Sequence, residues 1–317
     1  MNLELTRRKF LRTATAGIAG LAAGARPASA KAAATVIIDT HTHFYDPSRP
    51  QGVPWPGRDD TSLYRTVLPK DYRAVPVPQP VTATVVVEAS PWVEDNQWAL
   101  DLAAKDKFIV GLVGHLPLGT DEFAGHLKRF AANPLFRGLR VNHDALTAGL
   151  GQAHYRADLE LLAQHDLELD VNGGPDMLPE VARLARALPG LRIVINHLAN
   201  VKIDGHAPPA GWRRDLEAAA QHKHVFLKVS ALVEGAGKND GSAPRDVMFY
   251  QPTLDAAWDA FGADRLIYGS NWPVNERFAS LATVQGIVTD YFTAKGQANV
   301  VKFFSRNAQA AYKWVKR

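Results

Sequence analysis

The feature of this sequence that most constrains its fold is a regular alternation of short apolar runs with longer segments of helical periodicity. Most of the runs are followed by a segment whose apolar residues recur every three or four positions, as in EDNQWALDLAAK and MLPEVARLARAL. Apolar strands that alternate with helices indicate a parallel sheet covered by helices. Eight such units in about 250 residues predict an α/β fold, a (β/α)8 TIM barrel. The runs are residues 36–39, 83–88, 108–113, 138–141, 167–171, 192–196, 225–229 and 266–269.

The first 30 residues have the layout of an export signal. The segment TRRKFLRTATAGIAGLAAGARPASA places Arg7 and Arg8 before a mildly apolar run and ends on a small-x-small cleavage signal at residues 28–30. This pattern is typical of a twin-arginine signal peptide. The run is shorter, and richer in Gly and Ala, than a membrane span of about 20 strongly apolar residues. We therefore expect a signal peptide at residues 1–30 and a single barrel domain at residues 31–317, periplasmic or secreted and without stable membrane insertion. A retained N-terminal anchor is the alternative.

The charge of the chain argues against a nucleic-acid partner. The formal charge of +4 results from 36 Lys and Arg against 32 Asp and Glu. Five of these basic residues and one acidic residue lie in the first 30 positions, so the rest of the chain is near neutral and has no polybasic stripe. The absence of cysteine excludes disulfides, zinc–thiolate sites and a cysteine nucleophile. We expect a small-molecule substrate and leave a homo-oligomer open.

Polar side chains stand at the carboxyl end of every predicted strand. Catalytic groups of such barrels sit at these ends, because the loops that follow surround one mouth. His41 and His43 follow the first strand, and residues i and i+2 of an extended segment point the same way. We therefore expect one site at this end of the barrel. The later strands end in Glu88; His115; Arg140 and Asn142; Asp170 and Asn172; His197; Lys228 and Ser230; and Ser270 and Asn271.

The resemblance to an enzyme family described in the next paragraph implies the hydrolysis of a small ester, and imidazoles at a barrel mouth are suited to that reaction. This reaction requires an activated water, a Lewis acid or hydrogen-bond donor on the carbonyl oxygen, and a group that moves the proton. Neutral imidazoles are good zinc ligands, so His41, His43 and His197 could bind one divalent ion, with zinc the first choice. They could instead polarise the carbonyl oxygen without a metal. Both alternatives fit the sequence.

Four motifs resemble one enzyme family. IDTHTHF follows the first strand, FRGLR lies at the fourth, VINHLAN at the sixth and RLIYGSNWPV at the eighth. They resemble the amidohydrolase-2 branch of the amidohydrolase superfamily, especially its sugar-lactonase group around L-fuconolactonase and L-rhamnonolactonase. The resemblance runs over residues 31–317 and implies a distorted barrel of the metal-dependent-hydrolase type that opens small cyclic esters. In that group the metal varies and some members work without one. A decarboxylase or hydratase of a small carboxylic acid is the alternative that the superfamily implies.

The motif at the eighth strand departs from this family at Asn271. The usual motif is similar to GSDWP, in which the aspartate binds metal and acts as the general base. An amide has no useful basicity, so Asn271 cannot be that base, although it can position water. Either Glu88 or one of the histidines is then the base, or hydrolysis is lost and the chain is a non-catalytic small-molecule-binding protein.

Two surface loops are predicted to border the site. The proline-rich segment 44–72 is expected to form a lid, and the segment 233–250 is expected to form the opposite rim. The C-terminal segment 299–317 is predicted to be an amphipathic helix that packs on the barrel.

The predicted site has three groups of residues. The guanidinium of Arg140 could clamp a substrate, or it could pair with Glu88 or Asp170. The catalytic residues are His197, Glu88 and Asn271; the substrate-binding residues are Arg140, Trp272, Trp55 and His115; and the metal or carbonyl ligands are His41, His43 and His197.

Overall fold

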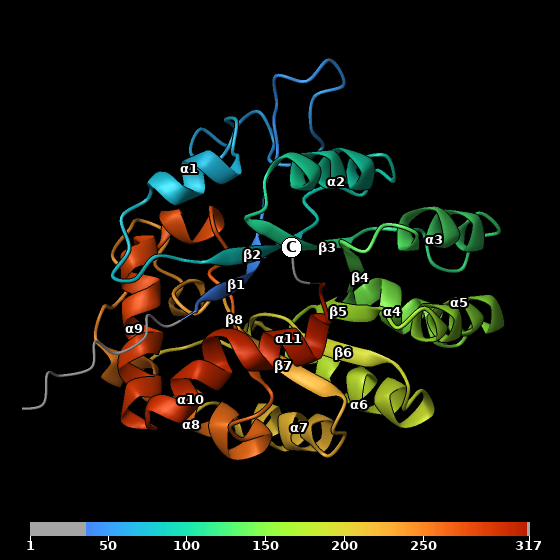
Figure 1. Ribbon diagram of the computed structural model, residues 1–317. Coiled ribbons are helices and arrows are strands. Elements are labelled where there is room, and N and C mark those ends of the chain that lie inside the picture. The colour runs from blue at the N-terminus through green and yellow to red at the C-terminus, as the bar shows by residue number, and fades with distance from the viewer. Residues whose placement is uncertain (1–35, 316–317) are drawn as a thin grey trace, which may run out of the picture. The chain divides into compact units, whose positions relative to one another are not determined.

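The computed structural model describes residues 36–315, so the predicted signal peptide lies outside the described residues. Eight parallel strands follow one another in chain order around a barrel, and the helices lie outside them (Figure 1). This confirms the predicted TIM barrel, and each predicted strand differs from the observed one only at its ends. The strands are β1 (Ile38–Thr42), β2 (Ala83–Val87), β3 (Ile109–Gly114), β4 (Phe136–Asn142), β5 (Glu168–Asn172), β6 (Arg192–Ile195), β7 (Val225–Val229) and β8 (Leu266–Tyr268).

The barrel closes through the two motifs that carry the predicted site. The backbone N–H of Asn271 donates to the carbonyl of His41 at 2.9 Å, and that of His43 donates to the carbonyl of Trp272 at 2.9 Å. Thr42 and Trp272 form an isolated parallel bridge beyond the end of β8. The positions of His41, His43 and Asn271 are therefore fixed to one another by main-chain hydrogen bonds.

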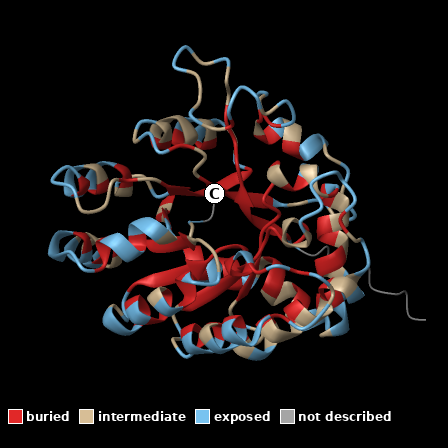
Figure 2. Cartoon of the chain, turned by 180° about the vertical axis from the view of Figure 1, so that it is seen from behind, coloured by how far each residue is buried: buried red, intermediate tan, exposed pale blue. Residues whose placement is uncertain are grey.

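Amphipathic helices form the outer layer. Figure 2 shows that the strands and the inner faces of the helices are buried, while the outer helix faces are exposed. In α6, for example, Met177, Val181 and Leu184 are buried, which is the spacing of one helix face. The helices are α1 (Pro69–Ala74), α2 (Asp95–Lys105), α3 (Phe123–Ala131), α4 (His143–Gly149), α5 (Ala153–Gln164), α6 (Met177–Ala187), α7 (Ala210–Ala220), α8 (Val247–Phe261) and α9 (Leu281–Ala294), with short 3-10 turns η1 (His197–Asn200), η2 (Glu234–Ala236) and η3 (Val274–Arg277).

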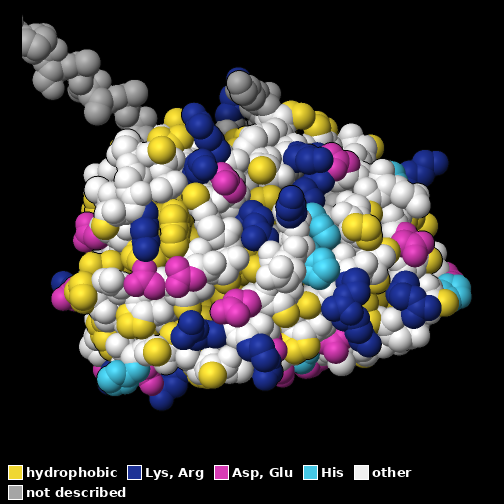
Figure 3. All heavy atoms as spheres, turned by 90° about the horizontal axis from the view of Figure 1, so that it is seen from below, with side chains coloured by type: hydrophobic (Ala, Val, Ile, Leu, Met, Phe, Trp, Pro, Cys, Tyr) yellow, Lys and Arg dark blue, Asp and Glu magenta, His cyan; other side chains and the backbone are white. Residues whose placement is uncertain are grey.

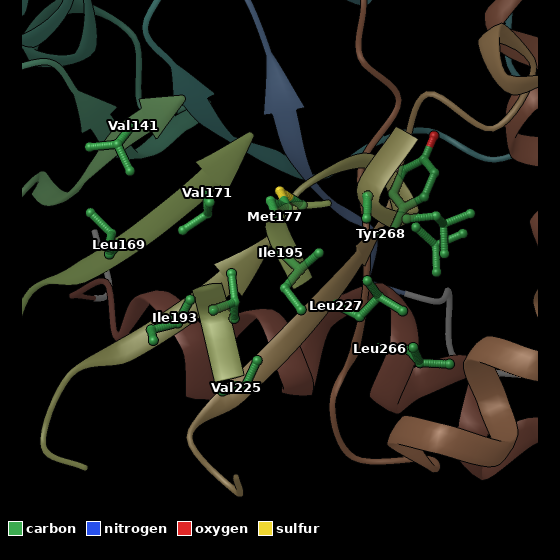
Figure 4. Close-up of a cluster of buried hydrophobic side chains, with 14 of the residues drawn as sticks. Val141, Leu169, Val171, Met177, Ile193, Ile195, Val225, Leu227, Leu266 and Tyr268 are labelled. Carbon is green, nitrogen blue, oxygen red and sulfur yellow. The ribbon is translucent and has the colours of Figure 1, made fainter. Parts of the chain in front are cut away.

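In several strands, alternate residues belong to two separate apolar clusters. Ile193, Ile195 and Leu227 belong to the larger cluster, part of which is drawn in Figure 4. Val194 and Phe226, their neighbours in sequence, belong to a smaller cluster. This alternation is the expected consequence of strand geometry, in which successive side chains point to opposite faces. Both faces of the sheet are therefore packed.

The C-terminal segment packs on the barrel as predicted. It consists of α10 (Gln297–Val301), the π-helical turn η4 (Lys302–Arg306) and α11 (Asn307–Tyr312). The amide of Asn307 donates to the carbonyl of Leu266 at 2.8 Å, which ties α11 to β8. Its inward residues join the clusters described above, which closes this part of the core. The buried residues of the segment include Val300, Phe303, Phe304, Ala308, Ala311 and Tyr312.

The surface has a mixed character. On the face shown in Figure 3, basic and acidic side chains lie next to one another and are interspersed with apolar ones. Within residues 36–315, no helix has both the length and the apolar character needed to cross a membrane.

Candidate active site

Three histidines lie together at the carboxyl end of the barrel, two from the end of β1 and the residue after it and one from the start of η1. The ring centroids of His41 and His43 are 4.9 Å apart, and those of His41 and His197 are 4.3 Å apart. All three side chains are buried. The structure therefore brings together the three imidazoles that the sequence predicted to converge.

A cavity of about 610 Å³ opens beside these histidines. It lies over the ends of β1 to β5, and His43 is the histidine of the cluster that lines it. Four other predicted site residues also reach it. The polar and aromatic residues of its lining are His43, Trp55, Glu88, Ser90, His115, Arg140, Asn142, Tyr155 and Asn172.

His43 is held between the backbone and Asn271. Its Nδ1 lies 3.0 Å from the carbonyl oxygen of Val87 and so donates to it, which leaves Nε2 without a proton in the neutral ring. Burial lowers the pKa of His43 to about 3, with Arg140 as a further cause, so the ring is neutral near pH 7. Nε2 lies 3.3 Å from Oδ1 of Asn271, so in this tautomer two hydrogen-bond acceptors face each other.

His41 is oriented by a buried lysine. Nζ of Lys228 donates to Nδ1 of His41 at 3.3 Å and to Oδ2 of Asp170 at 2.7 Å. Burial, and next the neighbouring charge of His197, lower the pKa of His41, so its ring is neutral and carries its single proton on Nε2. That Nε2 is buried and has no hydrogen-bond partner among the described residues. The arrangement supplies an unused N–H donor at the site.

His197 is oriented by a serine at the end of β7. Its Nδ1 lies 2.7 Å from Oγ of Ser230, a hydroxyl that can accept the Nδ1 proton and leave a lone pair on Nε2. Burial, with Lys228 as the next cause, lowers the pKa of His197. The residue has a φ of 58° and starts a turn in which Leu198 and Ala199 also have positive φ. The indole of Trp212 donates to the carbonyl of Leu198 at 3.0 Å and supports this turn.

Arg140 and Glu88 form an ion pair on the wall of the cavity. Nε of Arg140 donates to Oε1 of Glu88 at 2.7 Å, and an Nη donates to the Glu88 carbonyl at 2.9 Å. Oε2 of Glu88 accepts from the backbone N–H of Ser90 at 2.8 Å. Both carboxylate oxygens are therefore engaged, which does not favour Glu88 as the base. His115 lies on the same wall, and burial lowers its pKa.

The proline-rich segment after β1 covers part of the cavity. Trp55 lines the cavity, and its ring lies 5.6 Å from that of His43. Arg49 anchors the segment to α2 through two hydrogen bonds to Asp95, at 2.9 and 3.1 Å. The lid is thus tied down at the described position, with Trp55 beside the histidines.

Trp272 lies in the core instead of on the cavity wall. It is buried, and its ring packs 5.1 Å from that of Tyr72 and 6.1 Å from that of Phe44. Its Nε1 donates to Glu276 at 2.7 Å. The substrate-binding role predicted for Trp272 therefore has no support from its position, because the bulk of the indole is used for packing.

The three histidines, as they are arranged, do not offer a metal site. Val87 engages Nδ1 of His43 and leaves a lone pair on its Nε2, whereas Lys228 engages Nδ1 of His41, whose Nε2 presents a proton instead of a lone pair. Within residues 36–315, no group of three or more His, Cys, Asp or Glu side chains is placed to hold a metal ion. The metal role of His41, His43 and His197 stays a prediction, and we route no step through a metal.

Two charged residues of the site, the buried Lys228 and the half-buried Glu234, were not assigned a role from the sequence. Lys228 was noted only as a residue at a strand end, and Glu234 only as part of the loop after the seventh strand. Oε1 of Glu234 accepts from Nδ2 of Asn271 at 3.0 Å. The signal that could have pointed to Glu234 is the missing carboxylate at position 271, which invites a search for an acid in a neighbouring loop.

Comparison with known families assigns the chain to one of them. A family model described as amidohydrolase matches residues 38–314. The chain belongs to this amidohydrolase family, as the four sequence motifs predicted, and it is a hydrolase-type enzyme.

Relatives and solved structures in this family are similar over most of the chain. A Burkholderia ambifaria protein named L-fucono-1,5-lactonase is 32% identical over 243 residues, which is 76% of this chain and 81% of the relative. A protein of the same name from Burkholderia multivorans is 30% identical over 258 residues, 79% of this chain and 86% of the relative. The crystal structure of a Burkholderia multivorans amidohydrolase with bound zinc has a TM-score of 0.76 and 26% identity, over 88% of this chain and all of that one.

Proposed function

We propose that this protein hydrolyses a neutral, sugar-derived lactone. Two relatives named L-fucono-1,5-lactonase, each at least 30% identical, support a lactonase. The observation that carries the choice of a neutral substrate is the charge of the cavity. Among the described residues that line it, Arg140 is the one Lys or Arg, and Glu88 already neutralises it at 2.7 Å.

The Arg140–Glu88 pair favours hydroxyl groups over carboxylates as ligands. A carboxylate substrate needs an uncompensated cation, because its desolvation is costly without one. A paired guanidinium still has N–H groups that can donate to sugar hydroxyls, and Asn142 and Asn172 add amides on the same wall. The cavity therefore suits a polyhydroxylated ring with no net charge.

We assign the proton chemistry to His41 and His197. Hydrolysis needs a donor on the carbonyl oxygen and an acceptor for the proton of water. The Nε2–H of His41 is the donor, and Nε2 of His197 is the acceptor. Water attacks the carbonyl carbon, the ring C–O bond breaks, and the proton taken by His197 passes to the departing ring oxygen. In this scheme Asn271 orients the water.

The test is acid release from two matched sets of lactones by the purified protein. One set contains neutral sugar lactones and the other contains lactones that carry a carboxylate. We expect turnover of at least one neutral sugar lactone and at least tenfold lower kcat/KM on the charged set, as about 1.4 kcal/mol of unfavourable carboxylate burial would give. Carbon dioxide release from a small carboxylic acid, without lactone turnover, would support the decarboxylase alternative instead.

Removing the charge of Glu88 should shift the preference towards charged lactones. In Glu88→Gln the guanidinium of Arg140 becomes an uncompensated cation, so KM for a carboxylated lactone should fall about tenfold, in line with the strength of a charged hydrogen bond. Glu94→Gln is the matched control, because Glu94 pairs with Arg129 on the surface at 2.6 Å. An unchanged ratio of KM values between the two lactone sets would contradict the charge argument.

Chelation should leave turnover intact if the histidines act without a metal. We expect less than a twofold change in kcat after treatment with EDTA and removal of the chelator, because Lys228 engages Nδ1 of His41 and its Nε2 then presents a proton instead of a lone pair. Metal analysis of the treated sample is the control. Loss of turnover that added Zn²⁺ restores would show that the predicted metal role is correct and that the ring nitrogens rearrange to bind it.

A further inference from the structure

Glu234, Asn271 and His43 lie next to one another at the ends of three strands. Oε1 of Glu234 accepts from Nδ2 of Asn271 at 3.0 Å, and Oδ1 of Asn271 faces Nε2 of His43 at 3.3 Å. Oε2 of Glu234 is buried and has no hydrogen-bond partner among the described residues. A buried carboxyl oxygen without a hydrogen-bond partner costs free energy, so its presence calls for an explanation such as a function or a bound water.

The direction of the Asn271 amide depends on the charge of Glu234. A carboxylate accepts only, so it holds Nδ2 and turns Oδ1 towards the histidines. A protonated carboxyl can donate to Oδ1, and the amide can then turn to place Nδ2 towards Nε2 of His43. The neutral His43 ring presents a lone pair at Nε2, so the two orientations of the amide differ in whether Asn271 offers an acceptor or a donor to the site.

The backbone fixes both ends of the Glu234–Asn271 contact. The N–H of Ile203 donates to the carbonyl of Gly235 at 2.8 Å, which ties η2 to the segment after η1. A Cβ at Gly235 would meet the side chain of Ile203 at 2.9 Å, so η2 packs tightly there. On the other side, Asn271 has a φ of 63° and is bonded to His41 through its backbone N–H. The contact is therefore a consequence of two rigid loops.

The surroundings of Glu234 favour titration in the neutral range. Burial raises the pKa of Glu234 to about 7, and the hydrogen bond from Asn271 opposes this rise. Two other titratable groups face it. Tyr250 of α8 has its pKa raised by burial and next by the charge of Glu234, and the exposed Lys202 lies on the rim of a second cavity of about 270 Å³ that Glu234 also lines. This cavity gives the carboxyl a route to solvent that does not pass through the larger one.

We propose that Glu234 is a positioning residue that acts through Asn271. Its carboxylate holds the amide so that Oδ1 accepts a hydrogen of the attacking water, and the two residues together replace the acceptor that an aspartate at position 271 would supply alone. The role in water attack rests on the proposed lactonase function, whereas the control of the amide orientation does not.

The orientation can be tested without any turnover. Protein labelled with ¹⁵N at asparagine gives a side-chain amide signal for Asn271, which is assigned by its loss in Asn271→Asp. We expect this signal to shift with pH around a midpoint of about 7, and to be independent of pH in Glu234→Gln. The matched control is Glu160→Gln, at an exposed residue of α5, which should keep the shift. A signal that does not titrate in the wild-type protein, or that still titrates in Glu234→Gln, would overturn the proposal.

Kinetics on an active lactone then test the role in water attack. We expect kcat of Glu234→Gln to fall about tenfold with little change in KM, as loss of a charged hydrogen bond predicts. The fall in kcat below about pH 7 should disappear in this variant and return in Glu234→Asp. An unchanged pH profile of kcat in Glu234→Gln, with the NMR result as expected, would refute the catalytic part alone. If no lactone is turned over by the wild-type protein, the NMR result still decides the orientation.

Discussion

His197→Ala should lower kcat/KM for the preferred lactone by roughly 10²–10⁴-fold, the range typical of removing a general base. The structure gives two reasons for so large an effect. Ser230 fixes Nδ1 of the ring at 2.7 Å and so directs Nε2, and the ring of His41 lies only 4.3 Å away. An acceptor and the N–H donor of His41 are thus adjacent, and alanine removes the acceptor.

The measurement is steady-state acid release by the wild type and the variant, with a circular dichroism melt of each protein. His154→Ala is the matched control, because His154 is an exposed histidine of α5. Its kcat/KM should stay within twofold of wild type. If His197→Ala folds normally and keeps its turnover, the base is another group and our assignment of the proton chemistry is wrong. Asn271 would then remain a residue that orients water for a base still to be found.

The strands and the strand-end residues could be predicted because both depend on local pattern. Continuous Val, Ile and Leu runs indicate buried parallel strands, and the barrel topology then places His41, His43 and His197 at one end. The closing helix could be predicted for the same reason, since its apolar residues recur on one side. Nothing beyond the order of the elements was needed for these inferences.

The sequence could not decide between alternative contacts at the site, because these contacts join distant residues. Arg140 pairs with Glu88, which lies 52 positions away in the sequence. Asp170, the other partner predicted for Arg140, binds Lys228 instead. Trp272 follows the site motif directly, yet the turn of the chain sends its indole into the core. The identity of each residue indicates which chemical roles it can take. The tautomer of His41 and the hydrogen bonds to the Glu88 carboxylate depend on neighbouring residues that only the fold reveals.

Lys228→Met should cost roughly 3–5 kcal/mol of unfolding free energy, because it leaves the buried carboxylate of Asp170 without its partner. Lys228 and Asp170 are both fully buried, and their charged atoms are 2.7 Å apart. Urea unfolding followed by circular dichroism measures the change. Lys302→Met is the matched control: Lys302 pairs with Asp264 on the surface, where such a pair contributes about 1 kcal/mol or less. A loss in Lys228→Met no larger than in this control would contradict the expectation.

A second substitution separates the stability of the Lys228–Asp170 pair from its effect on His41. Lys228→Met combined with Asp170→Asn removes the unpaired charge, and asparagine keeps an oxygen that can accept from the hydroxyl of Tyr312, which donates to Asp170 at 3.0 Å. We expect the double variant to recover much of the stability. It should not recover turnover, because methionine cannot donate to Nδ1 of His41 and the ring is then free to carry its proton on either nitrogen. Recovery of both properties would mean that Lys228 serves the fold alone, and the Nε2–H donor of His41 would need another cause.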